Sequence, residues 1–255
     1  MTSGDSSTAT SAASAVIIRE YKSSDRSAIR EICLQAASQQ PDPLFREDPE
    51  LAPLLLVDYY LDYEPEQCFV AELDGKVVGY IATCKNTEDY NRAVRRRILP
   101  RLALRILWKV ITLQFRNRST YKALWWKVVA GLSARPREEL PLPITEYPAH
   151  SHRNVRHGYR GKGIGHSLAV RQHDHLRQQG IKGMHAVLVE EAGNDALSRE
   201  LCRKRGFEIL ATIPHAVLRK VTGQDYLLKL LVCDLEKEAR NAASAEDRIS
   251  TASNQ

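Results

Sequence analysis

The sequence predicts a mixed α/β fold with a basic helical insertion near its middle. Two observations lead to this prediction. Short apolar runs of strand length alternate with helix-length segments on both sides of the insertion. Between them, residues 86–143 combine apolar residues at helical spacing with a strong excess of positive charge. Without this insertion, the expected order of elements is β-α-α-β-β followed by β-α-β-α-β-β.

The segment before the insertion predicts one strand, two helices and a hairpin. The run AVIIREY has the apolar, β-branched character of a strand, and the following Ser24 and Asp25 are typical helix caps. An Asp74-Gly75 pair joins two apolar runs, which is a strong signal for an antiparallel hairpin. The expected elements are a strand at 15–21, a helix from 24 to about 38, a helix at 49–60, and strands at 68–73 and 76–83.

The insertion is predicted to form long helices with one apolar and one basic face. Between Lys85 and Glu139, fourteen Lys and Arg stand against four Asp and Glu, a net charge of +10. The whole chain carries +6, so the remainder is about −4 (6 − 10) and the basicity belongs to this segment. All three tryptophans, at 108, 125 and 126, also lie here. The apolar positions at helical spacing are Leu99, Leu102, Ala103, Ile106, Val110 and Leu113, and the cations on another face are Arg97, Arg101, Arg105 and Lys109.

The segment after the insertion returns to alternating strands and helices. The expected elements are a strand at 144–155, a helix at 161–179, a strand at 183–189, a helix at 194–205, and strands at 207–213 and 226–233.

The two ends of the chain have a composition that does not support a core. Residues 1–15 are rich in Ser, Thr and Ala, and residues 239–255 are equally polar, so we expect disordered tails around one domain at 16–238. We expect no secretory or mitochondrial signal in the first stretch. Five widely spaced cysteines predict free thiols, and no apolar run reaches the roughly 18 residues of a membrane span. The expected location is the cytoplasm, with the nucleus as the alternative.

The stretch YRGKGIG, at 159–165, lies at a strand-to-helix junction and predicts an anion site. Glycine lets amide N–H groups approach a phosphate without obstruction. The stretch does not fit a P-loop, because only two residues separate Gly158 from Gly161-Lys162 and Gly163 follows. It also does not fit the dinucleotide fingerprint, because His166 and Leu168 stand where the third glycine would be required.

The pattern Arg160-x-x-Gly163-x-Gly165 resembles the pyrophosphate-binding motif of the GNAT superfamily of acetyl-CoA-dependent N-acetyltransferases. The order of elements around it also matches that family. The segment from Asn194 to Gly206-Phe207 resembles the family's second signature, in which a helix ends in Lys/Arg-x-Gly-Phe. The run Tyr-Pro-Ala-His at 147–150 resembles a stretch of one branch that includes the acetyltransferase-like domain of O-GlcNAc hydrolases. The likeness covers about 16–233 and implies a mixed, mostly antiparallel central sheet flanked by helices.

The resemblance implies acetyl-CoA as co-substrate, a primary amine as acceptor, and a set of residues that bind the cofactor. Main-chain amides from Arg160 to Gly165 would hold the pyrophosphate, with Arg160 and Lys162 adding charge. The strand segment 153–155 would bind the pantetheine arm, and the Val155 N–H would polarise the thioester carbonyl. Asn194 would bind the cofactor beyond the next strand. The implied cofactor-binding residues are therefore Arg153, Asn154, Val155, Arg160, Gly161, Lys162, Gly163, Ile164, Gly165 and Asn194.

Transfer of an acetyl group also needs a base for the amine proton and an acid for the departing thiolate. His150 and His152 are candidate bases on one strand face, and Glu190 or Glu191 are candidates at the end of the next strand. For any single one of these residues, a structural role is the commoner explanation. The family's usual acid is a tyrosine four residues before the Gly of Gly-Phe, and Cys202 stands there instead. We expect its neighbours Arg203, Lys204 and Arg205 to favour the thiolate, which is a poorer proton donor.

The motif strand departs from the family in its polarity, because Ser151, Arg153 and Arg156 replace apolar residues and His157 often a proline. These departures and Cys202 leave open a catalytically silent module that binds acetyl-CoA. No metal site is predicted, because His173 and His175 point about 200° apart on a helix and no cysteine stands at ligand spacing.

The insertion is expected to be a lid on the acceptor groove, since its tryptophans and apolar face favour burial. The alternative is a peripheral membrane or nucleic-acid contact through its cations. The acceptor and the oligomeric state are not readable from the sequence.

Overall fold

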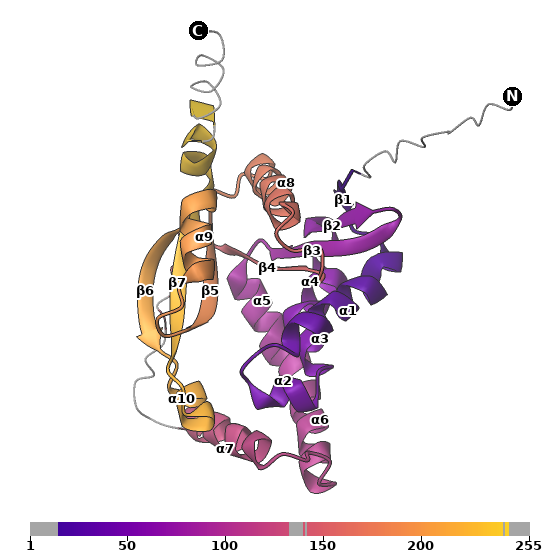
Figure 1. The fold of residues 1–255 in the computed structure, drawn as a ribbon, viewed down its shortest axis with the longest axis vertical. Helices are drawn as coiled ribbons and strands as arrows, with labels where there is room; N and C mark the ends of the chain where they lie inside the picture. Colours follow the sequence, from indigo (N-terminus) through magenta and orange to yellow (C-terminus); the bar gives the residue numbers. More distant parts are fainter. Residues whose placement is uncertain (1–14, 133–139, 141, 242, 245–255) are drawn as a thin grey trace, which may run out of the picture.

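Seven strands form one mixed sheet in the order β1-β2-β3-β4-β5-β7-β6 (Figure 1). The computed structural model describes residues 15–132, 140, 142–241 and 243–244. Neighbouring strands are antiparallel except β4 and β5, which are parallel, so the expected mostly antiparallel sheet is confirmed. The strands are β1 (Ile17–Glu20), β2 (Cys68–Leu73), β3 (Lys76–Cys84), β4 (Ala149–Val155), β5 (Gly183–Glu191), β6 (Glu208–Pro214) and β7 (Tyr226–Asp234).

Helices lie on both sides of the sheet and below it in the view of Figure 1. They are α1 (Arg26–Ala37), α2 (Pro43–Glu47), α3 (Leu51–Leu56), α4 (Asp58–Tyr63), α5 (Thr87–Ala93), α6 (Leu99–Ile111), α7 (Arg118–Leu132), α8 (Ile164–Gln178), α9 (Ala196–Arg205) and α10 (Ala216–Thr222). A π-helix, η3 (Val94–Ile98), joins α5 to α6.

The first half of the sheet is buried on both faces. Val70 of β2 belongs to a core cluster with Ile29 of α1. The preceding residue, Phe69, belongs to a second cluster with Leu168 of α8. Alternate residues of a strand point to opposite faces, so α1 and α8 cover opposite sides of β2 and β3.

The predicted hairpin between β2 and β3 is confirmed, and its turn explains its position. Asp74 and Gly75 have φ values of 51° and 72°. Both central residues are therefore left-handed, as in the two-residue turns whose twist matches that of the flanking strands.

The second half of the sheet consists of β5, β7 and β6 and packs against α9. Leu201 of α9, Phe207 and Leu231 of β7 share a core cluster with Leu176 of α8. Helix α8 therefore contributes to the cores of both halves.

The insertion packs against the first half through α6. Leu102, Ile106 and Val110 lie against a cluster containing Leu51 and Phe115. An ion-pair network fixes the same contact: the Asp48 side chain is buried, and its carboxylate oxygens lie 2.8 Å from Arg105 Nη2 and 2.7 Å from Lys109 Nζ. Helix α7 then crosses from α2 to α10, so the insertion connects the two halves (Figure 1).

Two parts of the chain differ from the sequence prediction. The strand expected at 144–155 begins only at Ala149, because the chain turns between two prolines and Tyr147 N–H donates to the Pro143 carbonyl at 2.8 Å. The short helices α2 and α10 were not predicted. Both have local caps: the Asp42 side chain accepts from Leu44 N–H, and Gly223 ends α10 with a φ of 79°.

The chain is helical over 235–241 and 243–244, so part of the segment expected to be a polar tail has regular structure. The rest of that segment, and residues 1–14, lie outside the described residues. In the part of the chain that the structure covers, no helix combines the length and apolar character that a membrane crossing requires.

Candidate active site

Strands β4 and β5 separate after two residue pairs. Ala149 lies opposite Met184, and His150 lies opposite His185. Beyond these pairs β4 continues to Val155 and β5 to Glu191, without further pairing between them in the described structure. The two strands therefore diverge beyond these pairs (Figure 1), and we call this gap in their main-chain pairing the opening.

The main chain of β4 presents unpaired N–H groups to this opening, whereas the Val155 carbonyl accepts from Arg160 Nε at 3.1 Å. Arg156 N–H donates to the Val78 carbonyl at 2.8 Å, so the main-chain groups of this position face β3. Main-chain groups alternate in direction along a strand, so those of Arg153 and Val155 face away from β3, toward β5. Since β5 no longer pairs there, these N–H groups have no strand partner.

A glycine-rich loop follows β4 and leads into α8. Gly158, Gly161 and Gly163 have φ values of 86°, 79° and 78°, and a Cβ on any of them would meet nothing within 4 Å. Gly163 is the N-cap of α8. Among the described residues, no acceptor is bonded to the N–H groups of 161–165. Exposed amides at a helix N-terminus attract an anion, as the sequence predicted for this stretch.

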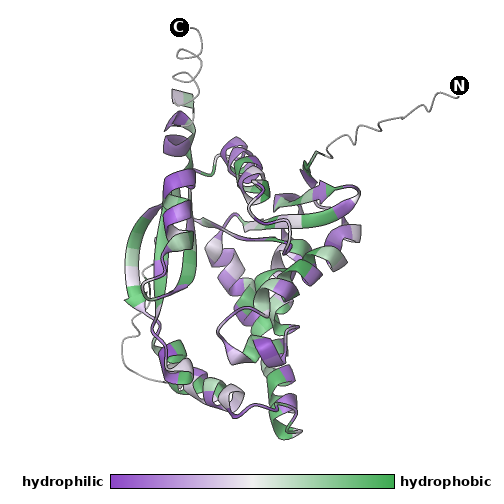
Figure 2. Ribbon diagram, viewed as in Figure 1, coloured by the Kyte–Doolittle hydropathy of each residue, from purple (hydrophilic) through white to green (hydrophobic). Residues whose placement is uncertain are grey.

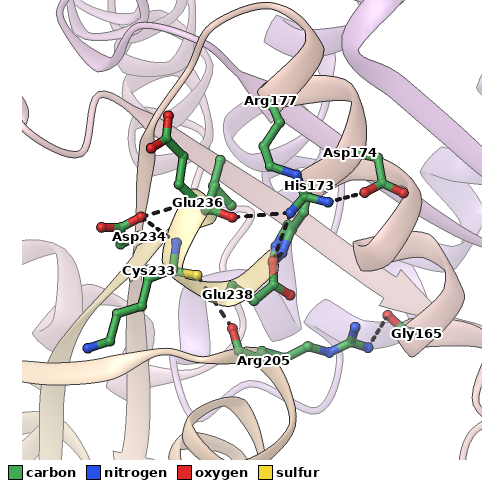
Figure 3. A network of polar contacts seen from close by, with 11 residues as sticks. Gly165, His173, Asp174, Arg177, Arg205, Cys233, Asp234, Glu236 and Glu238 are labelled. Carbon is green, nitrogen blue, oxygen red and sulfur yellow. Dashed lines mark hydrogen bonds and ion pairs between the residues drawn. The ribbon is translucent and has the colours of Figure 1, made fainter. Parts of the chain in front are cut away.

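Two arginines lie beneath the start of α8 and donate to the same carbonyl. Arg153 Nη1 and Arg205 Nη2 lie 2.7 Å and 3.2 Å from the Gly165 oxygen (Figure 3 shows Arg205 and Gly165). Arg205 is 5% exposed, and its Nη1 has no hydrogen-bond partner. Burial lowers the pKa of Arg205 to about 10, with a further contribution from the charge of Arg153. Neither guanidinium has a carboxylate partner among the described residues, whereas Arg156 pairs with Glu31 at 2.7 Å.

His150 is a neutral imidazole whose Nε2 carries the lone pair. Thr87 Oγ1 lies 2.7 Å from the Pro148 carbonyl and 2.7 Å from His150 Nδ1. The hydroxyl has one proton and the carbonyl can only accept, so Thr87 donates to Pro148 and accepts from His150 Nδ1–H. Burial, with smaller contributions from His185 and His152, lowers the pKa of His150 to about 3. Nε2 is therefore unprotonated at neutral pH and can accept a proton, but a pKa this far below 7 makes it a weak base.

His152 lies on the same face of β4 but is engaged differently. Its Nδ1 lies 3.0 Å from the Tyr80 hydroxyl, which also accepts from Asn154 Nδ2 at 3.1 Å. Burial lowers the pKa of His152 to about 4. The side chain of Asn154 is therefore used within the fold, and its main-chain groups face β3, as those of Arg156 do, so the structure leaves neither free for a ligand.

Glu190 is bound on both carboxylate oxygens. Its Oε1 accepts from the N–H groups of Leu197 and Ser198 at 2.9 Å each, at the start of α9. Its Oε2 lies 2.8 Å from Lys229 Nζ, and both side chains are buried. Burial alone would raise the pKa of Glu190, but the contacts with Lys229 and Ser198 lower it overall. These contacts give Glu190 a structural role at the start of α9. The other candidate, Glu191, is exposed to solvent.

Cys202 is a protonated thiol. Burial raises its pKa, and Lys229 offsets this only in part. The expectation that Arg203, Lys204 and Arg205 favour the thiolate is therefore wrong. The thiol packs against the cluster around Leu201 and Phe207, and its assignment as an acid rests on the sequence resemblance.

Asn194 lies on the other side of the opening, before α9. Its main-chain N–H donates to the Glu191 carbonyl at 2.9 Å, and its Oδ1 accepts from Ala196 N–H at 3.4 Å. The residue is exposed, so its side-chain amide is accessible to a ligand.

One group of side chains has the chemistry of a metal site. His173, Cys233 and Glu238 place ligand atoms within 4.8 Å of one another (Figure 3). The sequence argument against a metal missed Cys233, because β7 brings it to α8 from 60 residues away along the chain (233 − 173). The ligand atoms already have partners: His173 Nδ1 lies 3.0 Å from Glu238 Oε2, which also accepts from Arg177 at 3.2 Å. A cation would have to displace Arg177, so the group is best explained as a polar contact between α8 and the final helix.

Comparison with known proteins gives the fold. No protein-family model matches the sequence. The crystal structure of SsHAT has a TM-score of 0.57 at 21% identity, covering 87% of this chain and 98% of its own. A GCN5-related N-acetyltransferase from Kribbella flavida has a TM-score of 0.50 at 17% identity, covering 86% of this chain and 98% of its own. The chain has the GNAT fold.

A third GNAT-fold structure, the putative acetyltransferase yncA from Salmonella typhimurium with its cofactor acetyl-CoA, has a TM-score of 0.50 at 18% identity. It covers 87% of this chain and 94% of its own. The match to these structures confirms the fold that the motif Arg160-x-x-Gly163-x-Gly165 predicted.

Several residues of this GNAT fold escaped the sequence analysis. Thr87 orients His150, His185 lies beside it where the strands part, Tyr80 bonds His152, and Lys229 neutralises Glu190. None of them lies near its partner in the sequence, so no local pattern identifies them. The only available signal was the concentration of histidines after position 149.

The two buried histidines predict a loss of stability in mild acid. In the unfolded chain they gain protons near pH 6.5, whereas the folded pKa values of His152 and His150 are about 4 and about 3. Between pH 6.5 and those folded values the unfolded state binds more protons than the folded state. The unfolding free energy therefore falls as the pH is lowered, by up to about 1.4 kcal/mol per pH unit for each histidine. Urea unfolding at neutral pH and near pH 5 measures this difference in unfolding free energy. His150→Gln should reduce the difference, and the exposed His157→Gln should not. An equal fall in all three proteins contradicts the assignment.

Replacement of Arg205, which is buried without a carboxylate partner among the described residues, should stabilise the fold. Arg205→Leu removes a buried cation, and the Gly165 carbonyl keeps its bond from Arg153. The expected gain in unfolding free energy is about 1–4 kcal/mol. The exposed Arg203→Leu on the same helix should change it by less than about 0.5 kcal/mol. Urea titration compares the two, and a loss of stability on Arg205→Leu would show that the guanidinium is satisfied in solution.

Proposed function

We propose that this protein is an acetyl-CoA-dependent N-acetyltransferase that acts on a primary amine. The observation that carries the proposal is the opening between β4 and β5, which leads directly to the unpartnered amides at the start of α8. An extended chain with amide groups, ending in a pyrophosphate, matches both parts of this surface.

The proposed cofactor site uses mainly the main chain. The N–H groups of 161–165 bind the pyrophosphate, and the exposed Arg160 and Lys162 add positive charge. The N–H groups of Arg153 and Val155 bind the pantetheine arm along β4. Asn194 contacts the arm from the side of β5.

We propose His150 as the base, because its Nε2 is unprotonated at neutral pH and its ring is held by Thr87. As the amine nitrogen bonds to the acetyl carbon, the thioester C–S bond breaks and the amine proton passes to Nε2. The Val155 N–H donates to the developing oxyanion. The Cys202 thiol gives its proton to the departing sulfur, and solvent exchange restores both groups. His152 positions Tyr80 and Asn154, and Glu190 holds α9.

We further propose that the insertion closes one side of the acceptor groove. Pro43 of α2, Ser119 of α7 and Thr222 and Tyr226 near α10 line one cavity of about 350 Å³. The walls of this cavity come from both halves of the fold, and α7 joins them. This placement supports the expectation of a lid, but the burial on which that expectation rested is not found for Trp108 and Trp125, which are each 64% exposed.

Cofactor binding should depend on Gly163 but not on an equivalent glycine at the other end of α8. Gly163 and Gly180 have φ values of 78° and 75° with free space around both. Alanine at either position strains the backbone by about 1–2 kcal/mol, but only Gly163 lies among the amides that would bind the pyrophosphate. Acetyl-CoA and CoA should raise the Tm of the unmutated protein and of Gly180→Ala, since both bind the folded state. Gly163→Ala should lose most of this shift. No shift in the unmutated protein would refute the cofactor assignment.

Catalysis should depend strongly on His150 and weakly on Cys202. Release of CoA thiol is measured with a panel of alkylamines, amino acids, lysine peptides and aminoglycosides. His150→Gln should lower kcat by about 10²–10⁴-fold, and His175→Gln on α8 is the control. Cys202→Ala should cause a smaller loss, because a thiolate can leave without an acid. Cys202→Tyr should raise the rate.

The alternative to an enzyme is a silent module that binds acetyl-CoA. It is favoured if the unmutated protein shows the thermal shift and neither it nor Cys202→Tyr releases CoA with any amine. An unchanged rate in His150→Gln, with turnover otherwise present, excludes His150 as the base.

A further inference from the structure

Helix α6 has two apolar faces, and only one of them is covered. Leu102, Ile106 and Val110 pack into the core cluster beneath α6. On the opposite side, Leu104, Leu107, Trp108 and Ile111 recur at i, i+3, i+4 and i+7, which is one face of a helix. With Leu113, which follows the helix, they form the outer stripe, whose members are 68%, 53%, 64%, 66% and 77% exposed in chain order. Scattered apolar residues are ordinary on a surface, but a continuous helical stripe of this exposure indicates a binding surface.

The outer stripe lies at an extremity of the molecule. The end of α6 is the lowest part of the view in Figure 1, and Figure 2 shows this end as largely hydrophobic. A flat partner can therefore reach the stripe without contact with the sheet or with α8.

The cations near the outer stripe are not neutralised by the protein. Residues 90–132 contain eleven Lys and Arg and no Asp or Glu. Four of these cations pair with carboxylates of the body or of α5: Arg92, Arg105, Lys109 and Lys127. The remaining seven have no ion pair within the described residues: Arg95, Arg96, Arg97, Arg101, Arg116, Arg118 and Lys122. Of these, Arg101 lies one turn from Leu104 and two turns from Trp108 on α6.

We propose that the outer stripe docks on the surface of an anionic lipid bilayer, with Trp108 and its neighbours at the level of the headgroups. An amphipathic helix that combines tryptophan, leucine and isoleucine on one face with flanking Arg and Lys is suited to lie in that interface. The charge is complementary to anionic lipid. A second copy of this chain would bring the same unneutralised cations together, and a nucleic acid would leave the apolar stripe uncovered. This proposal does not depend on the transferase activity.

Intrinsic fluorescence and vesicle flotation test the proposal with the full chain. All three tryptophans lie in the insertion, and Trp108 and Trp125 are each 64% exposed, so tryptophan emission reports on this region alone. Vesicles of phosphatidylcholine with phosphatidylserine should bind the protein, shift its emission to the blue and, when brominated, quench it. Vesicles of phosphatidylcholine alone should bind it more weakly, by about fivefold for each cation that contacts the surface.

Matched variants separate the stripe from general surface effects. Leu104→Ser, Leu107→Ser and Ile111→Ser together should abolish binding while keeping Trp108 as the probe. The control is Ile209→Ser with Leu210→Ser, which alters two apolar residues of β6 that are 47% and 53% exposed. Arg95→Glu with Arg96→Glu should weaken binding, and Arg203→Glu with Lys204→Glu on α9 should not. Circular dichroism and thermal melting verify that each variant is folded.

Three results overturn the proposal. The first is absence of binding to phosphatidylserine vesicles at low salt, and the second is equal binding by the stripe variant and the unmutated protein. The third is a dimer in solution that the stripe variant converts to a monomer, without vesicle binding, which would assign the stripe to a second copy. Salt-sensitive binding to duplex RNA or DNA without vesicle binding would instead assign the cations to a nucleic acid.

Discussion

The early end of the pairing between β4 and β5 is the constraint on which the rest of the site depends. If the register continued beyond His150 and His185, β5 would occupy the N–H groups of Arg153 and Val155. Because it ends there, an edge of unpaired main chain lies inside the sheet instead of at its margin. The same divergence brings the loop at 158–163 to one end of the opening and Asn194 to the other side. A single feature of topology thus supplies most of the proposed cofactor contacts without specialised side chains.

The polar residues of β4 are arranged by face, and both faces carry a cost in stability. His150 and His152 point to one side and are held neutral by burial, whereas Arg153 points to the other, where it meets Arg205 beneath α8. Apolar residues would stabilise the fold better at these positions. Natural proteins tolerate such conflicts mainly at functional sites. The two arginines place positive charge beneath the start of α8 at the expense of the unfolding free energy, and that charge would favour a phosphate at the proposed site on 161–165.

The sequence predicted the parts of the structure that local chemistry determines. The Asp74-Gly75 turn fixed the hairpin, and the glycines before Ile164 fixed the start of α8. The contacts of the side chains were not predictable, because they join distant segments. Glu190 was a candidate base on its position after a strand, but Lys229 and the amides of α9 occupy it. Cys202 was expected to be acidic from its cationic neighbours in the sequence, but burial raises its pKa, and the charges that bear on the thiol come from Lys229, Glu190 and Glu208.

The insertion contributes residues to the core of the domain. Some of its apolar residues and some of its cations contact the body, and the others do not. Leu51 has no exposed surface, and Phe115 belongs to the cluster that covers it. Arg105, Lys109 and Lys127 pair with Asp48 and Asp42 of the body, and the exposed Arg92 pairs with Asp89 of α5. The other seven cations of 90–132 have no ion pair among the described residues. Helix α7 lies against α2 and α10, and residues of or next to all three line the cavity proposed for the acceptor. The insertion therefore divides its two proposed roles between its helices, with α6 carrying the outer stripe and α7 one wall of that cavity.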